Sequence, residues 1–128
     1  MRLLEKENTV DKIYLNEMEF YGYHGVFPEE TKLGQRFIVD IVVETDLAKA
    51  GQTDCLDDSI NYGELFEVVQ GIMEGEPMKL LEAVAETIST KLLDKFPSIQ
   101  TCTVKVIKPN PPIRGHYKSV AIEITRGR

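Results

Sequence analysis

Four segments with alternating apolar residues surround two segments with helical periodicity, and this order restricts the fold more than any other feature of the chain. The strand-like segments start near positions 13, 37, 101 and 120, and the helical segments lie between about 61 and 95. Strands in adjacent pairs around two helices predict an α+β fold of order ββααββ, in which a four-stranded antiparallel sheet carries both helices on one face. Such a sheet has open edges and encloses little space, so we expect a homo-oligomer whose subunits form a ring.

Several local signals refine this outline. In the first strand the apolar positions change parity between Leu15 and Met18, which predicts a β-bulge. The spacing of Asn61 and Glu64 is that of a helix N-terminus. Pro77 suits the first position of the second helix, and the stretch from Leu47 to Asp58 is interpreted as a connection.

The bulk properties set limits on partners and location. With 128 residues the chain has the size of one domain, predicted here as residues 11–128 after a flexible N-terminal extension of residues 1–10. The net charge of −6 and the absence of a basic cluster make nucleic acid and anionic membranes poor partners. Cys55 and Cys102 are predicted to be free thiols, and the N-terminus lacks an apolar run of signal-peptide length, so a cytoplasmic location is expected.

Lys108 breaks the pattern of its own strand. Alternation places it in one row with Cys102, Val104 and Val106, whereas Lys105 lies on the opposite face. An ammonium group in an apolar row either extends to water or has its pKa lowered toward use as a general acid or base. The row therefore identifies Lys108 as a candidate catalytic residue. The alternative, a lysine that only extends to water, stays open.

Three further positions have both a functional and a structural interpretation. Glu82 lies at the margin of the second helical stripe, where it either favours the helix dipole or presents a half-desolvated carboxylate to a cationic or amidine-like group. The segment from Phe20 to Glu30 combines four aromatic residues and His24 with glycines, which suits either a flat ligand slot or a packed aromatic corner. Tyr62 either packs its ring in the core or also offers its hydroxyl to a site.

Other kinds of catalytic site find no support in the sequence. His24 and His116 are the two histidines, so one chain cannot supply a three-histidine zinc site. No phosphate-binding loop, serine elbow or dinucleotide fingerprint is present. An enzyme with this sequence would work by proton transfer through Lys, Glu and Tyr side chains, with no metal and no cofactor.

Five short motifs together resemble one known family. They are Phe20-Tyr21-Gly22-Tyr23-His24-Gly25, Glu30 before Gly34-Gln35, Asn61-Tyr62-Gly63-Glu64, Leu80-Leu81-Glu82, and Lys108 followed by Pro111-Pro112-Ile113. In this order they resemble the dihydroneopterin aldolases of folate biosynthesis, over nearly the whole chain from about Val10 to Arg126. The resemblance implies the tunnelling fold, in which four subunits close a barrel and two such rings stack into an octamer with sites between subunits.

The resemblance also implies roles for individual residues. Glu82 would hold the amino-pyrimidinone edge of a pterin, helped by the backbone of Leu81. Lys108 would donate and accept the proton, Glu30 would contact the hydroxylated side chain of the substrate, and Tyr62 would reach the ligand from a neighbouring subunit. Lys108, Tyr62 and Glu30 are thus the predicted catalytic residues. Cleavage of 7,8-dihydroneopterin needs neither a lysine Schiff base nor a metal, because the N5=C6 imine of the ring takes up the electron pair.

The sequence departs from the family pattern at two positions, and two other functions are alternatives to this hypothesis. Asn61 and Arg114 replace the His and Pro that relatives often carry, which affects contacts between neighbouring subunits more than the chemistry. One rival is a 2′-epimerase of the same fold acting on dihydroneopterin triphosphate, with Arg114 and Lys118 as the nearby cationic groups. The other is a non-catalytic pterin- or purine-binding module, which would not need Lys108 and Tyr62.

Overall fold

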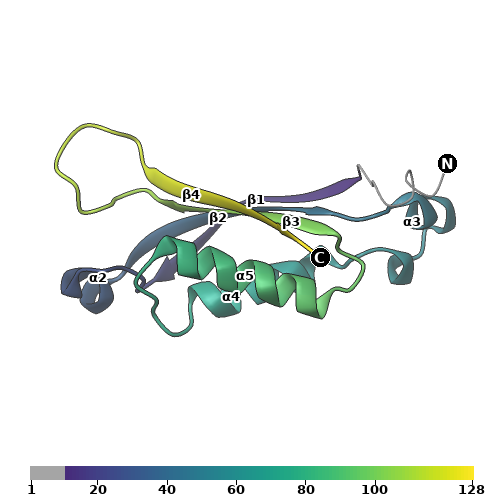
Figure 1. Cartoon of the computed structure of the whole chain (residues 1–128), viewed down its shortest axis with the longest axis horizontal. Helices are drawn as coiled ribbons and strands as arrows, with labels where there is room; N and C mark the ends of the chain where they lie inside the picture. Colours follow the sequence, from purple (N-terminus) through teal and green to yellow (C-terminus); the bar gives the residue numbers. More distant parts are fainter. Residues whose placement is uncertain (1–10) are drawn as a thin grey trace.

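The computed structural model describes residues 11–128, and the predicted flexible extension of residues 1–10 lies outside the described residues. Four antiparallel strands form one sheet in the order of the chain: β1 (Lys12–Gly22), β2 (Gln35–Glu44), β3 (Thr101–Lys108) and β4 (Val120–Gly127). Helices α4 (Tyr62–Met73) and α5 (Leu81–Lys95) lie together against one face of this sheet (Figure 1). The predicted α+β arrangement is confirmed.

Three short elements fall where the sequence pattern indicated loops. Helix α2 (Pro28–Leu33) interrupts the segment between β1 and β2, and it projects from one end of the sheet (Figure 1). Helix α3 (Ala48–Thr53) and a 3-10 turn (Leu56–Asp58) occupy the connection before α4, at the other end. Each is too short to show a helical stripe in the sequence.

The core forms where the apolar rows of the two central strands meet the helices. Val39 and Ile41 of β2 are paired with Val106 and Val104 of β3, and all four side chains are fully buried. Helices α4 and α5 cover this row with buried side chains of their own, at Leu65, Val69, Ile72, Met73, Leu81, Val84, Ala85, Ile88 and Leu92. Removal of each of these side chains other than that of Ala85 from water contributes roughly 1.5–3 kcal/mol.

The predicted bulge in β1 is present. The pairing of β1 with β2 shifts register between Leu15 and Met18, and Glu17 has a φ of 57°. The N–H of Glu17 donates to the Asp40 carboxylate at 2.6 Å, which holds the bulge against β2. The extra residue returns Met18 and Phe20 to the buried face.

The two long helices start differently from each other. Asn61 caps α4, because its side-chain oxygen accepts a hydrogen bond from the N–H of Gly63 at 2.9 Å. Helix α5 begins at Leu81, so the prediction that Pro77 starts this helix is wrong. The reason is tertiary: Met78 uses its N–H and its carbonyl in hydrogen bonds to His24 and Gly25, and it therefore stays outside the helix.

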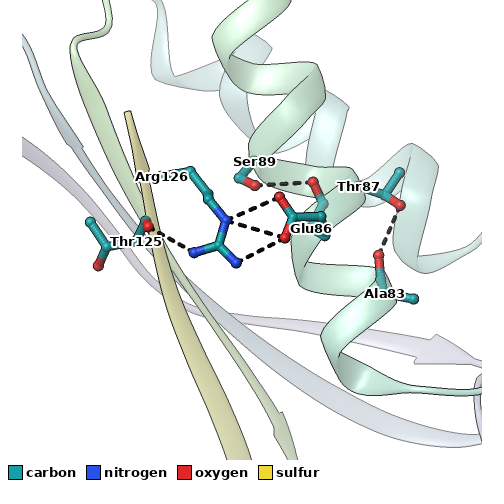
Figure 2. Close-up of polar contacts among 6 residues, drawn as sticks. All are labelled: Ala83, Glu86, Thr87, Ser89, Thr125 and Arg126. Atoms are coloured by element: carbon teal, nitrogen blue, oxygen red, sulfur yellow. Dashed lines mark hydrogen bonds and ion pairs between the residues drawn. The ribbon is translucent and has the colours of Figure 1, made fainter. Parts of the chain in front are cut away.

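Helix α5 is also fastened to β4 and to the end of the chain. Arg126 of β4 donates to both carboxylate oxygens of Glu86 at 2.9 and 3.1 Å (Figure 2). The guanidinium of Arg128 donates to the carbonyls of Leu93, Phe96 and Ile99 at the C-terminal end of α5. The helix ends before Pro97, as its sequence predicts.

The sheet face opposite the helices is uncovered in the described part of the chain. A hollow of about 550 Å³ lies on it, lined by Glu17, Arg36, Ile38, Asp40, Lys105, Ile107, Pro109, Lys118, Ser119 and Ala121. Strands β1 and β4 are the two ends of the strand order, so the single chain leaves the barrel open. Within residues 11–128 no helix is both long and apolar enough to cross a membrane.

Two glycines provide a test of this packing. A Cβ atom at Gly22 would lie 2.7 Å from the backbone oxygen of Met73, whereas one at Gly71, on the exposed side of α4, meets nothing within 4 Å. We predict that Gly22→Ala lowers the free energy of unfolding by about 1–3 kcal/mol, because a backbone carbonyl has to move. Gly71→Ala should raise it by about 0.5–1 kcal/mol, through helix propensity.

Urea denaturation of both variants measures these changes. If Gly22→Ala is as stable as the unsubstituted protein, the end of β1 does not pack against the end of α4 as described.

Candidate active site

Lys108 is buried and paired with Glu30. It ends the apolar row of β3, and its Nζ atom lies 2.8 Å from Oε2 of the Glu30 carboxylate. The side chains of Lys108 and Glu30 are only 11% and 8% exposed. The ammonium therefore does not extend to water, which was one of the two outcomes expected for this row. A carboxylate from a segment 78 positions away compensates its charge instead.

The Glu30 carboxylate is surrounded by hydrogen-bond donors. Its Oε1 accepts from the N–H of Phe27 at 3.2 Å, and its Oε2 accepts from the side-chain amide of Gln35 at 3.0 Å as well as from Lys108. Burial raises the pKa of Glu30, but the hydrogen bonds from Lys108, Gln35 and Phe27 outweigh burial and hold the pKa below its usual value. Glu30 is therefore a stable carboxylate that fixes the position of the lysine.

Gln35 is a member of this cluster that sequence reasoning left without a role. It starts β2, two residues before Phe37, and so shares the parity of the buried row. A polar residue that continues an apolar row is the same signal that singled out Lys108. The Oε1 atom of Gln35 is buried and has no partner among the described residues, so one hydrogen-bond acceptor of the cluster is open.

Two glycines allow the loop after β1 to approach this cluster. A Cβ atom at Gly25 would lie 2.5 Å from the Glu30 carboxylate, so only a glycine leaves room for that side chain. Gly34 has a φ of 72°, and a Cβ atom there would meet the rings of Tyr21 and Tyr23 at 2.6 and 2.7 Å. Both glycines of the loop are therefore required by close approach.

His24 lies inside this loop and is fully buried. Its Nδ1 accepts a hydrogen bond from the N–H of Met78 at 3.0 Å, and its Nε2 lies 2.9 Å from the carbonyl oxygen of Met73. A carbonyl only accepts, so Nε2 carries the proton and the ring is neutral. Burial lowers the pKa of His24 and keeps it in this form. His24 is therefore a packed residue whose two ring nitrogens are both bonded to backbone groups.

The aromatic side chains of the loop do not form a closed slot in the single chain. Tyr21, Tyr23 and Phe27 are 55%, 41% and 51% exposed. The rings of Tyr21 and Tyr23 meet edge to face with centroids 5.7 Å apart, and the hydroxyl of Tyr21 donates to the carbonyl of Leu33. The loop therefore offers an aromatic rim beside the Lys108–Glu30 pair.

Glu82 and Leu81 begin α5 at this end of the molecule. Leu81 is buried and Glu82 is exposed, so the expected half-desolvated carboxylate is not present in the single chain. The segment just before them is bonded to His24 and Gly25, and Gly25 in turn contacts Glu30. The start of α5 is thus brought to the side of the cluster that Glu30 and Lys108 form.

Tyr62 is not brought together with these residues within one chain. It opens α4, and eleven helical steps of about 1.5 Å separate it from Met73, the residue that bonds to His24. Its side chain is 67% exposed, so the alternative that its ring packs in the core is wrong. Tyr62 lies roughly 17 Å along α4 from the end of the helix near the rest of the site. Its exposed side chain could therefore contact another subunit.

The described residues lack a cluster of metal-ligating side chains, and their buried thiol is held in the protonated form. Residues 11–128 contain no group of three His, Cys, Asp or Glu side chains placed to hold a metal ion. Cys102 is buried, and burial raises its pKa to about 11, which keeps the thiol protonated at neutral pH. The arrangement that remains is a buried lysine held by a carboxylate and an amide, which can transfer a proton to or from a ligand at Nζ.

Comparison with known proteins identifies the family of this chain. The family model described as dihydroneopterin aldolase matches residues 13–125. A dihydroneopterin aldolase of Bacillus subtilis is 66% identical over 117 residues, which cover 91% of this chain and 98% of that protein.

Two solved structures share the fold. A dihydroneopterin aldolase of Escherichia coli in complex with neopterin has a TM-score of 0.85 at 28% identity, covering 92% of this chain and all of that one. Another, from a Burkholderia species and bound to guanine, has a TM-score of 0.74 at 20% identity, covering all of this chain and 99% of that one. The family model and the Bacillus relative show that the chain belongs to the dihydroneopterin aldolase family.

Proposed function

We propose that this aldehyde-lyase carries out its proton transfers at the buried Lys108–Glu30 pair. The observation that carries the proposal is the 2.8 Å contact between Lys108 Nζ and a carboxylate that three donors hold in place. A positioned ammonium group in a site with little water is a suitable general acid, and after deprotonation a general base. Glu30 would also contact the hydroxylated side chain of the substrate.

The family reaction explains why proton transfer suffices. In 7,8-dihydroneopterin, loss of the 2′-hydroxyl proton allows the C1′–C2′ bond to break and glycolaldehyde to leave. The electron pair of that bond passes into the N5=C6 imine of the ring, and a proton added at C1′ completes 6-hydroxymethyl-7,8-dihydropterin. The protein must therefore orient the ring, remove one proton and return one, and we assign these transfers to Lys108, directly or through water.

The start of α5 is the proposed anchor for the pterin ring. A carboxylate at Glu82 can accept two parallel hydrogen bonds from an amino-pyrimidinone edge. The hydrogen bonds of the first turn begin with the N–H groups of Ala83 and Val84, so the backbone of Leu81 remains for the ligand. The neopterin complex of the Escherichia coli relative supports a pterin as the ligand.

We further propose that the working enzyme is a homo-oligomer, an octamer of two tetrameric rings. The open sheet and the exposed Tyr62 far from Lys108 support this assembly. A neighbouring subunit would then supply Tyr62 to the site as a second acid or base, which would also allow 2′-epimerisation. The aromatic ring of Tyr62 would cover a ligand bound at the exposed Glu82 and would shield that carboxylate from water.

A cytoplasmic location fits this function. Cys55 and Cys102 are both free thiols, which suits a reducing compartment. We therefore infer that the enzyme works on a small pterin in the cytoplasm, without a nucleic-acid or membrane partner.

The role of Lys108 can be tested against Lys105, which lies on the opposite face of the same strand. We predict that Lys108→Ala lowers turnover by about 10²–10⁴-fold while pterin affinity stays within about tenfold, because the ammonium transfers protons rather than anchors the ring. Lys105→Ala should retain normal turnover. Release of glycolaldehyde from 7,8-dihydroneopterin and calorimetric binding of neopterin measure the two effects.

Equal losses of binding and turnover in Lys108→Ala would make the lysine an anchor. If the unsubstituted protein releases no glycolaldehyde, the proposed function itself is wrong.

Glu82 has its own matched control one helical turn further on. Glu82→Ala should weaken pterin binding by about 2–5 kcal/mol, because it removes a carboxylate that grips the ring. Glu86→Ala removes a carboxylate that is bonded to Arg126 instead, and it should leave the affinity unchanged (Figure 2). Calorimetry with both variants decides the assignment, since equal affinities would place Glu82 outside the site.

A third prediction concerns the shared site. Tyr62→Phe and Lys108→Ala chains should each be inactive alone and should regain activity when their subunits are exchanged, because some interfaces then carry both original residues. The measurement is glycolaldehyde release after mixing, with the exchange itself followed by mass spectrometry of tagged chains. Well-exchanged mixtures that stay inactive would mean that both residues act within one chain.

A further inference from the structure

His24 joins two segments that carry different parts of the proposed site. Through Nδ1 it holds the N–H of Met78, which precedes α5, and through Nε2 it holds the carbonyl of Met73, the last residue of α4. The neighbouring N–H of Gly25 donates to the carbonyl of Met78 at 2.9 Å. His24 and Gly25 thus grip Met78 by both of its backbone groups.

Met78 is in turn fixed to α5, the helix that presents Glu82. The Met78 side chain packs against the core, and its sulfur lies 3.7 Å from the Thr87 hydroxyl, which itself donates to the carbonyl of Ala83 at 2.8 Å. Only Lys79 and Leu80 separate Met78 from the start of the helix at Leu81. A displacement of Met78 would therefore displace the first turn of α5 and the carboxylate on it.

The other side of the His24–Gly25 segment faces the proton-transfer cluster. Gly25 is so close to the Glu30 carboxylate that a Cβ atom would lie 2.5 Å from it, and Glu30 holds Lys108 at 2.8 Å. The ring of His24 also meets Phe37 of β2 edge to face, with centroids 5.6 Å apart. One short segment of loop therefore contacts Met78, three residues before α5, on one side and Glu30 on the other.

We propose that His24 is a positioning residue that sets the place of Glu82 relative to the Lys108–Glu30 pair, through its hydrogen bond from Met78. This inference rests on the proposed function, because it assigns the ring-binding role to Glu82. A buried residue with no ligand contact then acts on substrate affinity. The bond to Met73 has a different task, since it ties the loop to α4, which carries neither Glu82 nor Lys108.

Two amide variants separate the two hydrogen bonds. The side-chain oxygen of Asn reaches the place of Nδ1 and can accept from Met78, whereas the longer Gln places its amide nitrogen where Nε2 donates to Met73. We predict that His24→Gln weakens neopterin binding and raises KM by about tenfold, while kcat at saturating substrate stays within about threefold. His24→Asn should keep affinity within about threefold of the unsubstituted protein. Both variants lose one buried hydrogen bond, so their melting temperatures should fall by similar amounts.

A core variant away from the site controls for lost stability. Leu92→Ala removes a fully buried side chain from the later turns of α5 and should lower the melting temperature without changing affinity. Equal affinities of the Asn and Gln variants, or a loss in Leu92→Ala equal to that in His24→Gln, would reduce His24 to a core residue and overturn the proposal.

Two further measurements keep the test decisive. If His24→Gln does not fold, Met78→Ala removes the side chain that packs this segment onto the core, and a Met78→Ala affinity equal to that of the unsubstituted protein overturns the proposal. Calorimetry needs no turnover, so the order of the Asn and Gln affinities tests His24 even if glycolaldehyde release fails. Failure of that release counts against the proposed function alone.

Discussion

The ion pair between Lys108 and Glu30 is the interaction on which the arrangement of the site depends. Burial of two charges costs more than their mutual attraction returns unless further hydrogen bonds satisfy them, so such a pair is weak evidence for stability. Here Phe27 and Gln35 supply those hydrogen bonds, and the loop from Gly22 to Gly34 is shaped around the carboxylate. A cost of this kind is understandable where a lysine must be kept in one place and away from bulk water.

The location of the lysine could be predicted from the sequence because strand alternation is a strong constraint. Cys102, Val104 and Val106 are all buried, and Lys108 is the next residue of their row. The change of parity between Leu15 and Met18 likewise reports a real bulge. The same reasoning applied to β2 would have identified Gln35, since it precedes Phe37 in the buried row.

Other features depend on tertiary contacts that no local pattern carries. Helix α5 starts at Leu81 because the loop after β1 binds the backbone of Met78, not because of anything near Pro77. The partner of Lys108 comes from helix α2, which has six residues and no visible period. The exposure of Tyr62 and Glu82 similarly follows from what a single chain leaves uncovered.

Three glycines, one at the end of β1 and two in the segment that follows it, bear on how this family is recognised in new genomes. Gly22, Gly25 and Gly34 are required because a Cβ atom would strike Met73, Glu30 or two tyrosine rings. The sequence motif that they form with their aromatic neighbours is therefore required for packing, not for chemistry. A gene duplicate that had exchanged Lys108 for another residue could keep that signature intact and still be mistaken for an aldolase. With the proton transfers assigned to Lys108 as proposed, the last residue of β3 would separate a catalyst from an inactive descendant more directly than the glycine motif does.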